Sequence, residues 1–560
     1  MTTTTTIETA TNETMSGRED AMGMLPGVRN RFYSLVLLLD GLRYVYRKDN
    51  SLSQPDLESG VGTSDRETYF CFLNKLSQIC DSRPRQSQGG TVSAVTALDS
   101  GTIEYRLASN QRGAIELEEV RSYLTDILSI LGQATDDQVA DRDERAPIAS
   151  TILQRILAFN RPRIKDYLQL LVHDPKLEED RLDWCIRYAE NGTAQGVAAA
   201  RALRELQPYV DAARSALPLD SNEFARHAES LLQAIHRRYK NSLEAYMKGF
   251  SDPNSPWTEL RHAVGRLYSY FLAVRVMFEA RERWPRLFLD FEVTTVPSST
   301  PLEPPPNAKR RARDIIGQMP LREFDVEELQ AQVEPLQKHG LDEHLKRQSH
   351  STRFRPIVHA EVLLLDSVLR SRAAADRDGD GPLRFFNEAD FGGYIASSKP
   401  TCFLCHTYFT AHPARVKCRP SHYNHYINWK LPDLHPEDGP VALDKRKKII
   451  NEMVTKLRYE ISNDIISHSS TRSRHDSRDT PTNPFESTAL TESRIGDGGS
   501  MMLSAQFAGL ALSRRPAISE DRMSSRREVE RRDLDTASVM AVGDGSEVEV
   551  DDDEDGGARL

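Results

Sequence analysis

The chain has 560 residues, of which 39% are hydrophobic and 28% are charged, so it is long enough for two or three folded domains. The formal net charge of −10 lies mostly at the C-terminal end, where eight acidic residues stand among the last twenty. The remainder is close to neutral, which excludes a basic surface for nucleic acid along the whole chain. The apolar runs are too short to span a bilayer, so we expect no transmembrane segment and no membrane partner.

The first residues of the chain indicate the compartment, and the compartment indicates whether the cysteines form disulfides. A threonine tract with acidic residues lacks the basic and apolar regions of a secretion signal, so we expect an intracellular protein, cytoplasmic or nuclear, that is not secreted. Inside the cell, six cysteines do not predict a disulfide framework. Cys71, Cys80 and Cys185 stand singly in helical patterns and are predicted to be buried. The other three lie between positions 402 and 418 and need a different explanation.

The first predicted elements lie in residues 26–112, after a disordered start at residues 1–25. Apolar residues at helical spacing predict helices over 28–48 and 65–82. The period then changes, and residues 91–110 read as two short strands joined by Asp99-Ser100-Gly101, which is typical of a hairpin. From 113 to 292 the apolar period is helical throughout, which predicts an all-helical array.

The second half of the chain is predicted to contain a linker, a folded domain and a tail. Residues 293–312 are rich in proline and end in a basic cluster, as in an interdomain linker. Residues 313–470 have the composition of a folded domain. Residues 471–560 lack sustained periodicity and end in acidic residues, so we expect disorder there. A protein partner could bind the helical array or this tail.

Two short motifs in the second domain carry the chemistry. His359-Ala360-Glu361 stands where a β-like run becomes helical, and Cys402-Phe-Leu-Cys405 stands at a second such change. Cysteines three residues apart in the first turn of a helix share a face, and the helix N-terminus favours their thiolates. One imidazole and two thiolates suit a zinc ion with a fourth position left open, as catalytic zinc sites have. Glu361, two residues from a ligand, could then move protons without binding the metal.

These motifs resemble the H-x-E and P-C-x-x-C signature of the zinc-dependent cytidine and nucleic-acid deaminase superfamily. The runs HAEVLLL, SKPTCFLCHTYF and SHYNHYINW further resemble the deaminase-like branch found in fungal proteins and bacterial toxins. The resemblance covers residues 353–432. It implies that His359, Cys402 and Cys405 hold one Zn²⁺ ion and that Glu361 shuttles protons. Two departures are visible, since Pro400 precedes Cys402 by two residues and an insert at 373–382 lengthens the His-to-Cys separation.

The resemblance also implies a reaction and further site residues. The expected reaction is hydrolytic deamination of a nucleobase, a nucleoside or a base in single-stranded nucleic acid, with a zinc-bound hydroxide as the nucleophile. The helix at 65–82 and the hairpin resemble the opening elements of that fold, with Asn110 at the position that often contacts substrate. His425 and Trp429 are candidates for the pocket wall. The deaminase-like domain would then be split, with the helical array inserted between its two parts.

The predicted fold class is therefore α+β, with a large helical array, a small three-layer α/β/α deaminase-like sheet and a disordered C-terminal tail. The same cysteines also allow a second hypothesis, a structural zinc site. Cys402, Cys405, Cys418 and His422 have the spacing of a structural zinc finger, which needs nothing from His359. Four protein ligands would close the shell, and the domain would be a catalytically silent, zinc-stabilised interaction module on a helical scaffold.

Overall fold

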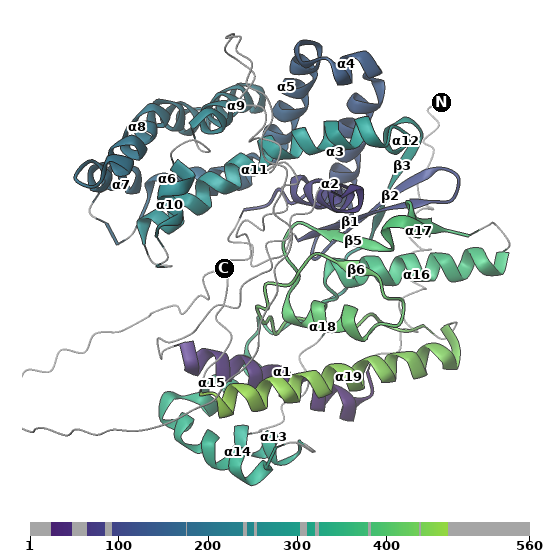
Figure 1. The fold of residues 1–560 in the computed structure, drawn as a ribbon. Coiled ribbons are helices and arrows are strands. Elements are labelled where there is room, and N and C mark those ends of the chain that lie inside the picture. Colours follow the sequence, from purple (N-terminus) through teal and green to yellow (C-terminus); the bar gives the residue numbers. More distant parts are fainter. Residues whose placement is uncertain are drawn as a thin grey trace, which may run out of the picture. The chain divides into compact units, whose positions relative to one another are not determined.

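The structure is a computed structural model of the full chain. It describes residues 24–47, 64–84, 92–174, 176–177, 179–238, 243–250, 252, 255–302, 311–319, 324–378, 382–435 and 438–468. Most of the two terminal segments for which the sequence predicts disorder lies outside these residues. The described part has an α+β fold in which many helices surround one small mixed sheet (Figure 1).

The sheet brings together segments that are far apart in the sequence. Its strands follow the order β3-β2-β1-β5-β6, and β4 also pairs with β1. The β1–β2 hairpin is antiparallel from Ser93↔Ser109 to Asp99↔Ile103, and β1 is antiparallel to β5 on its other side. The bounds are β1 Ser93–Asp99, β2 Ile103–Ser109, β3 Phe291–Val296, β4 Arg384–Phe385, β5 Tyr394–Ser397 and β6 Lys417–Cys418.

The two faces of the sheet belong to two different hydrophobic cores. In β1, Val95 and Ala97 join the core that contains α2 (Asp65–Ile79) and α3 (Ala114–Gln133). Ala94 and Leu98, which point the other way, join the core that contains α16 (Ala360–Asp378). Because side chains alternate along a strand, a strand with both faces covered must be apolar at nearly every position. All but the last residue of β1 is buried, so the sheet is the middle layer between helices.

The first core extends from the sheet into the helical array. Helix α11 (Pro256–Arg283) packs against α2 as well as against α5, α6 and α9, and most of its residues are buried. A helix that is apolar on nearly all sides occupies the centre of a bundle. The other helices of the array are α4 Asp136–Ala140, α5 Arg142–Phe159, α6 Arg161–Val172, α7 Arg181–Glu190, α8 Ala194–Ser215, α9 Ser221–Arg238, α10 Glu244–Lys248 and α12 Arg286–Leu289.

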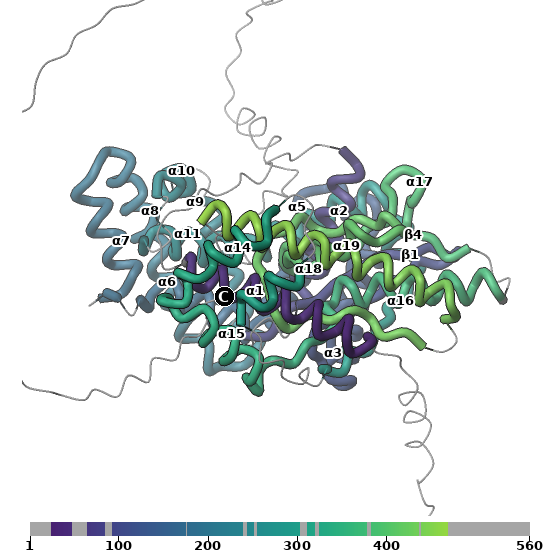
Figure 2. Tube along the Cα trace, turned by 90° about the horizontal axis from the view of Figure 1, so that it is seen from below, coloured from purple at the N-terminus to yellow at the C-terminus, as the bar shows by residue number. Residues whose placement is uncertain are grey.

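The second core lies on the other face of the sheet and joins both ends of the described chain. Helix α1 (Pro26–Arg47) lies beside α19 (Gly439–Ile466), as both views show (Figures 1 and 2). Helix α18 (Phe403–Ala411) packs against α19 and α16, so it lies between the sheet side and the terminal helices. The remaining elements are α13 Ala312–Gly317, α14 Val326–Val333, a 3₁₀ helix Glu334–His339, α15 Leu341–His350 and α17 Glu388–Phe391.

The expected linker at 293–312 differs from the structure at its N-terminal end. Residues 291–296 form β3, which pairs in parallel with β2 along its whole length. The run Phe-Glu-Val-Thr-Thr-Val has the β-branched and aromatic residues that favour a strand, and the proline-rich composition begins only after it, at Pro297. No helix in the described part of the chain is both long and apolar enough to cross a membrane.

Candidate metal centre

His359 is held at the start of α16 by contacts from two other segments. The backbone N–H of Ile357 donates to the Asn428 carbonyl at 3.3 Å, and the Lys430 N–H donates to the Ile357 carbonyl at 2.8 Å. This single parallel bridge replaces the strand that the sequence predicts before His359. The next residue is fixed from the hairpin, because Asn110 Oδ1 accepts a 2.7 Å hydrogen bond from the Ala360 N–H. These hydrogen bonds hold the backbone on both sides of His359 and so fix the position of its imidazole.

The two cysteines come from the first turn of α18. Cys402 is the N-cap residue, with extended backbone angles, and its Sγ accepts a 3.4 Å hydrogen bond from the Cys405 N–H. Cys402 thus uses its sulfur where a serine or aspartate would use oxygen, to cap an otherwise unsatisfied amide. The Phe403 N–H donates to the Asn424 carbonyl at 2.9 Å, so a distant loop also satisfies this helix start.

The structure brings His359, Cys402 and Cys405 together. His359 Nδ1 lies 3.6 Å from Cys402 Sγ and 3.4 Å from Cys405 Sγ. One ligand atom from each residue lies within 4.8 Å of the others, so the group could hold a metal ion. Both cysteines are buried, and His359 is partly exposed. The centre therefore has buried sulfur ligands and an imidazole nearer to solvent.

The electrostatics of the trio favour one thiolate even without a metal. Burial opposes ionisation of Cys402, but hydrogen bonding with Cys405 and the neighbouring His359 hold its pKa well below the ordinary value. Burial and the Cys402 sulfur raise the pKa of Cys405 well above its ordinary value. Burial alone would lower the pKa of His359, yet the Cys402 charge raises it. The site is thus prepared for a positive charge at the imidazole or at a bound cation.

Glu361 lies next to the trio without belonging to it. Its carboxylate accepts hydrogen bonds from Ser397 Oγ at 3.2 Å and from Cys405 Sγ at 3.8 Å. The side chain is only 3% exposed, and this burial raises its pKa against the opposing effect of His359. Raising the pKa of a carboxyl makes it a stronger base, which favours a role in proton transfer.

All three residues predicted to contact substrate have structural partners within the protein. Trp429 is fully buried, and its indole N–H donates to Cys405 Sγ at 3.3 Å. His425 donates from Nε2 to the Val36 carbonyl of α1 at 2.8 Å, and burial lowers its pKa to about 4. Asn110 lies at the end of β2 and contacts the start of α16, as described above. Their contact with substrate stays a prediction.

Cys418 and His422 lie outside the group of possible ligands. Cys418 is on β6, and its thiol has a pKa raised by burial to about 12. The Nδ1 atom of His422 accepts a 2.9 Å hydrogen bond from the Asn424 N–H. The part of the chain that the structure describes therefore gathers the open three-residue set and not the closed four-residue set.

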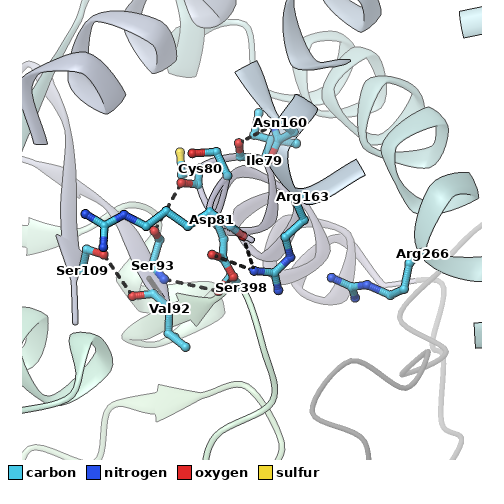
Figure 3. A network of polar contacts seen from close by, with 12 residues as sticks. Ile79, Cys80, Asp81, Val92, Ser93, Ser109, Asn160, Arg163, Arg266 and Ser398 are labelled. Carbon is cyan, nitrogen blue, oxygen red and sulfur yellow. Dashed lines mark hydrogen bonds and ion pairs between the residues drawn. The ribbon is translucent and has the colours of Figure 1, made fainter. Parts of the chain in front are cut away.

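Several supporting residues carry no signal in the sequence. Arg419 donates from Nη1 to the carbonyls of Ser397 and Ser398, at 3.2 Å each, and so fixes the loop before Cys402. The Ser398 hydroxyl donates to Asp81 Oδ2 at 3.1 Å, and Arg163 contacts the other carboxylate oxygen of Asp81 (Figure 3). The partners lie 21 and 22 positions apart for Arg419, 82 for Arg163 with Asp81 and 317 for Ser398 with Asp81, so no local pattern indicates them.

Comparison with known families agrees with this geometry. Residues 358–433 match the model of the OTT_1508_deam family, which is described as a deaminase-like family. The match starts beside His359 and ends beyond Trp429, so it includes the whole trio and Glu361. This segment is therefore a deaminase-like domain. No curated protein and no solved structure matches the chain.

Proposed function

We propose that this protein is a zinc-dependent hydrolytic deaminase acting on a nucleobase, a nucleoside or a base of single-stranded nucleic acid. The observation that carries the proposal is the convergence of His359, Cys402 and Cys405 beside the buried carboxylate of Glu361. The family match supports the same class of activity.

The donor set and its spacing suit zinc. A tetrahedral ion with Zn–S near 2.3 Å and Zn–N near 2.0–2.1 Å separates a sulfur from a nitrogen ligand by about 3.6 Å. The separations of His359 Nδ1 from the two sulfurs, 3.6 and 3.4 Å, fit this value. When bound, zinc supplies Lewis acidity that brings the ionisation of water close to neutral pH.

The residues of the chain divide the remaining work. Glu361 takes a proton from the attacking water and delivers it to the departing amine, so that ammonia leaves as a neutral molecule. Ser397 orients this carboxylate through its hydroxyl. The Trp429 N–H withdraws charge from Cys405 Sγ and holds the sulfur in place, as hydrogen bonds to metal ligands generally do.

The experiment compares the full-length protein with Glu361→Gln on a panel of nucleosides and single-stranded DNA and RNA. Ammonia release should fall by at least about 10²-fold, the usual contribution of a general acid–base, while zinc content is unchanged. Glu229→Gln is the matched control, because Glu229 is also buried but lies in the helical array.

Two results would contradict the proposal. One is equal turnover by the parent protein and Glu361→Gln. The other is a protein that carries zinc at this trio and releases ammonia from no member of the panel, which would favour the silent interaction module.

A further inference from the structure

A cleft of about 850 Å³ opens on the helical array beside the deaminase-like domain. Four basic residues line it, together with two acidic ones: Arg83, Arg112, Arg161, Lys165, Glu116 and Glu119. The formal charge of these lining residues is therefore positive, whereas the chain without its acidic C-terminal end is close to neutral. A local excess of positive charge in a cleft attracts anionic ligands.

Two residues that line the cleft, Arg112 and Ser82, lie within two sequence positions of residues that support the candidate metal centre. Arg112 follows Asn110 by two residues, and Asn110 holds the start of α16 at Ala360. Ser82, which accepts a hydrogen bond from Arg112, directly follows Asp81, and Asp81 accepts the hydrogen bond of Ser398 in the loop before Cys402 (Figure 3). A ligand in the cleft would therefore contact the same two segments that position the metal ligands.

Arg112 is a buried cation that forms no ion pair with any residue that the structure describes. It is 5% exposed, and its Nη2 donates only to neutral oxygens, the Cys80 carbonyl at 2.8 Å and Ser82 Oγ at 3.3 Å. Within the described ranges, its Nε has no hydrogen-bond partner and no carboxylate lies within ion-pair distance of the guanidinium. The nearby acids are already paired, Asp81 with Arg163 and Glu116 with Arg83. Burying an unpaired charge is costly, so an anion at this point would stabilise the site.

Three helices begin at the cleft, and α6 differs from the other two. Glu116 accepts a hydrogen bond from the Gly113 N–H at the start of α3, and Asp220 accepts from the Asn222 N–H at the start of α9. Helix α6 has no acidic residue in its first turn, and its N-cap Asn160 makes no side-chain capping bond. Its first five residues contain three bases instead, at 161, 163 and 165.

This arrangement is unfavourable for α6 on its own. The positive end of the helix dipole repels basic side chains, and carboxylates are the usual residues there. Arg163 is neutralised by Asp81, but Lys165 is exposed and has no partner among the described residues. Helix N-termini flanked by bases are common binding sites for phosphate.

On the basis of the proposed function, we propose that this cleft binds phosphate groups of a nucleotide or polynucleotide whose base enters the metal centre. Arg112 and Lys165 supply the charge, and the start of α6 supplies backbone dipoles. The neighbouring hollow shares Glu119 and Phe159 with the cleft, and its lining adds Glu118 and the ion pair Asp126–Arg155. The formal charge of that lining is negative and would repel a longer polyanion, so the cleft accommodates only the phosphates close to the reacting base.

Binding measurements on the full-length protein test this directly. The probes are a nucleoside, its 5′-monophosphate and a short single strand of mixed sequence, and the variants are Lys165→Glu, Arg112→Gln and the control Lys447→Glu. Lys447 is exposed on α19, away from the cleft lining. Lys165→Glu should weaken the binding of the phosphate-bearing probes about tenfold or more and leave the affinity for the nucleoside unchanged. Losing one phosphate contact should also reduce the salt dependence of strand binding by about 0.7 in log–log slope.

Comparing the monophosphate with the single strand shows whether the bound phosphate belongs to a nucleotide or to a polymer. Equal binding of the monophosphate and the strand identifies a nucleotide substrate, whereas much tighter strand binding identifies a polymer. Lys165 is exposed, so its variant folds even if Arg112→Gln does not. Equal weakening by Lys165→Glu and Lys447→Glu, or equal affinity for the nucleoside and its monophosphate, would overturn the inference. Ammonia release from nucleosides would still uphold the proposed function in that case, and phosphate binding without any deamination would uphold the cleft alone.

Discussion

The side-chain oxygen of Asn110 accepts a 2.7 Å hydrogen bond from the backbone N–H of Ala360, across 250 positions of sequence. Ala360 stands between His359 and Glu361, so this bond fixes the segment that presents both. The amide belongs to the first turn of α16, where N–H groups have no partner within the helix. The end of the hairpin thus completes a helix that follows only after the whole helical array.

Asn110→Ala should therefore disturb both stability and metal binding. The buried Ala360 N–H would lose its acceptor, which costs about 1–3 kcal/mol in unfolding free energy. Thermal unfolding and zinc titration of the variant would measure the two effects. Asn222→Ala is the control, because that side chain is exposed at the start of α9. Unchanged zinc affinity in Asn110→Ala would mean that the Asn110 bond does not position His359.

Local features of this site can be predicted from the sequence, whereas long-range contacts such as this bond cannot. The β1–β2 hairpin follows from alternation and from the Asp-Ser-Gly turn, in which Asp99 Oδ1 accepts from the Gly101 N–H. The motif residues His359, Cys402 and Cys405 follow from spacing, because each helix start displays a local pattern. Arg419 and Asp81 could not be predicted, since their partners become neighbours only after the sheet forms. The β3 strand overlaps the predicted linker because the prolines that follow the strand favour a linker over the whole stretch.

Metal content should discriminate the two ligand sets. His359→Ala and Cys402→Ser each remove an atom of the trio, so zinc per chain should fall from about one to well below it. Cys418→Ser and His422→Ala should retain zinc, since neither residue belongs to that group. Elemental analysis of the purified variants provides the measurement. Zinc lost from Cys418→Ser but kept by His359→Ala would support the closed, silent site.

Trp429→Phe tests the hydrogen bond to Cys405 separately from packing. The change removes the indole N–H that lies 3.3 Å from the sulfur, and losing such a partner typically weakens metal binding by 10–100-fold. Trp257→Phe offers a close match, because Trp257 is equally buried and its N–H has no hydrogen-bond partner in the part of the chain that the structure describes. Both variants should lose stability through the smaller ring, but only Trp429→Phe should bind zinc more weakly in a competition titration with a chelator. Equal zinc affinity in the two variants would count against this role.

Asp81→Asn should be strongly destabilising. Asp81 is 3% exposed, and it pairs with buried Arg163 at 3.2 Å while it accepts from Ser398 (Figure 3). Removing one charge of a buried pair leaves the other unpaired, at a cost of about 3–5 kcal/mol. The exposed pair Arg155–Asp126 provides the comparison, and Asp126→Asn should cost no more than about 1 kcal/mol. Urea unfolding of both variants gives the two free energies, and similar values would show that Asp81 does not connect the array to the site.

Asp464 should make stability depend on pH in an unusual direction. Asp464 is 6% exposed on α19, and its Oδ2 has no hydrogen-bond partner among the described residues. Burial raises the pKa of this carboxyl from 3.8 to about 7, with Glu460 adding to the shift and Arg43 opposing it. Between about pH 4 and pH 7 the unfolded chain loses this proton while the folded chain keeps it, so the folded state loses stability as the pH rises.

Asp464→Asn removes the titrating group and keeps its shape. The variant should match the parent protein near pH 4 and become more stable than it as the pH approaches 7, by at most about 4 kcal/mol for a shift of three pKa units. Asp444→Asn, on the same helix but exposed, should show no such trend, because its pKa is lowered by Lys448 and its titration lies below this range. Urea unfolding at several pH values measures the difference. A constant gap between Asp464→Asn and the parent from pH 4 to pH 8 would show that Asp464 is ionised in the folded protein throughout, with Arg43 compensating its burial.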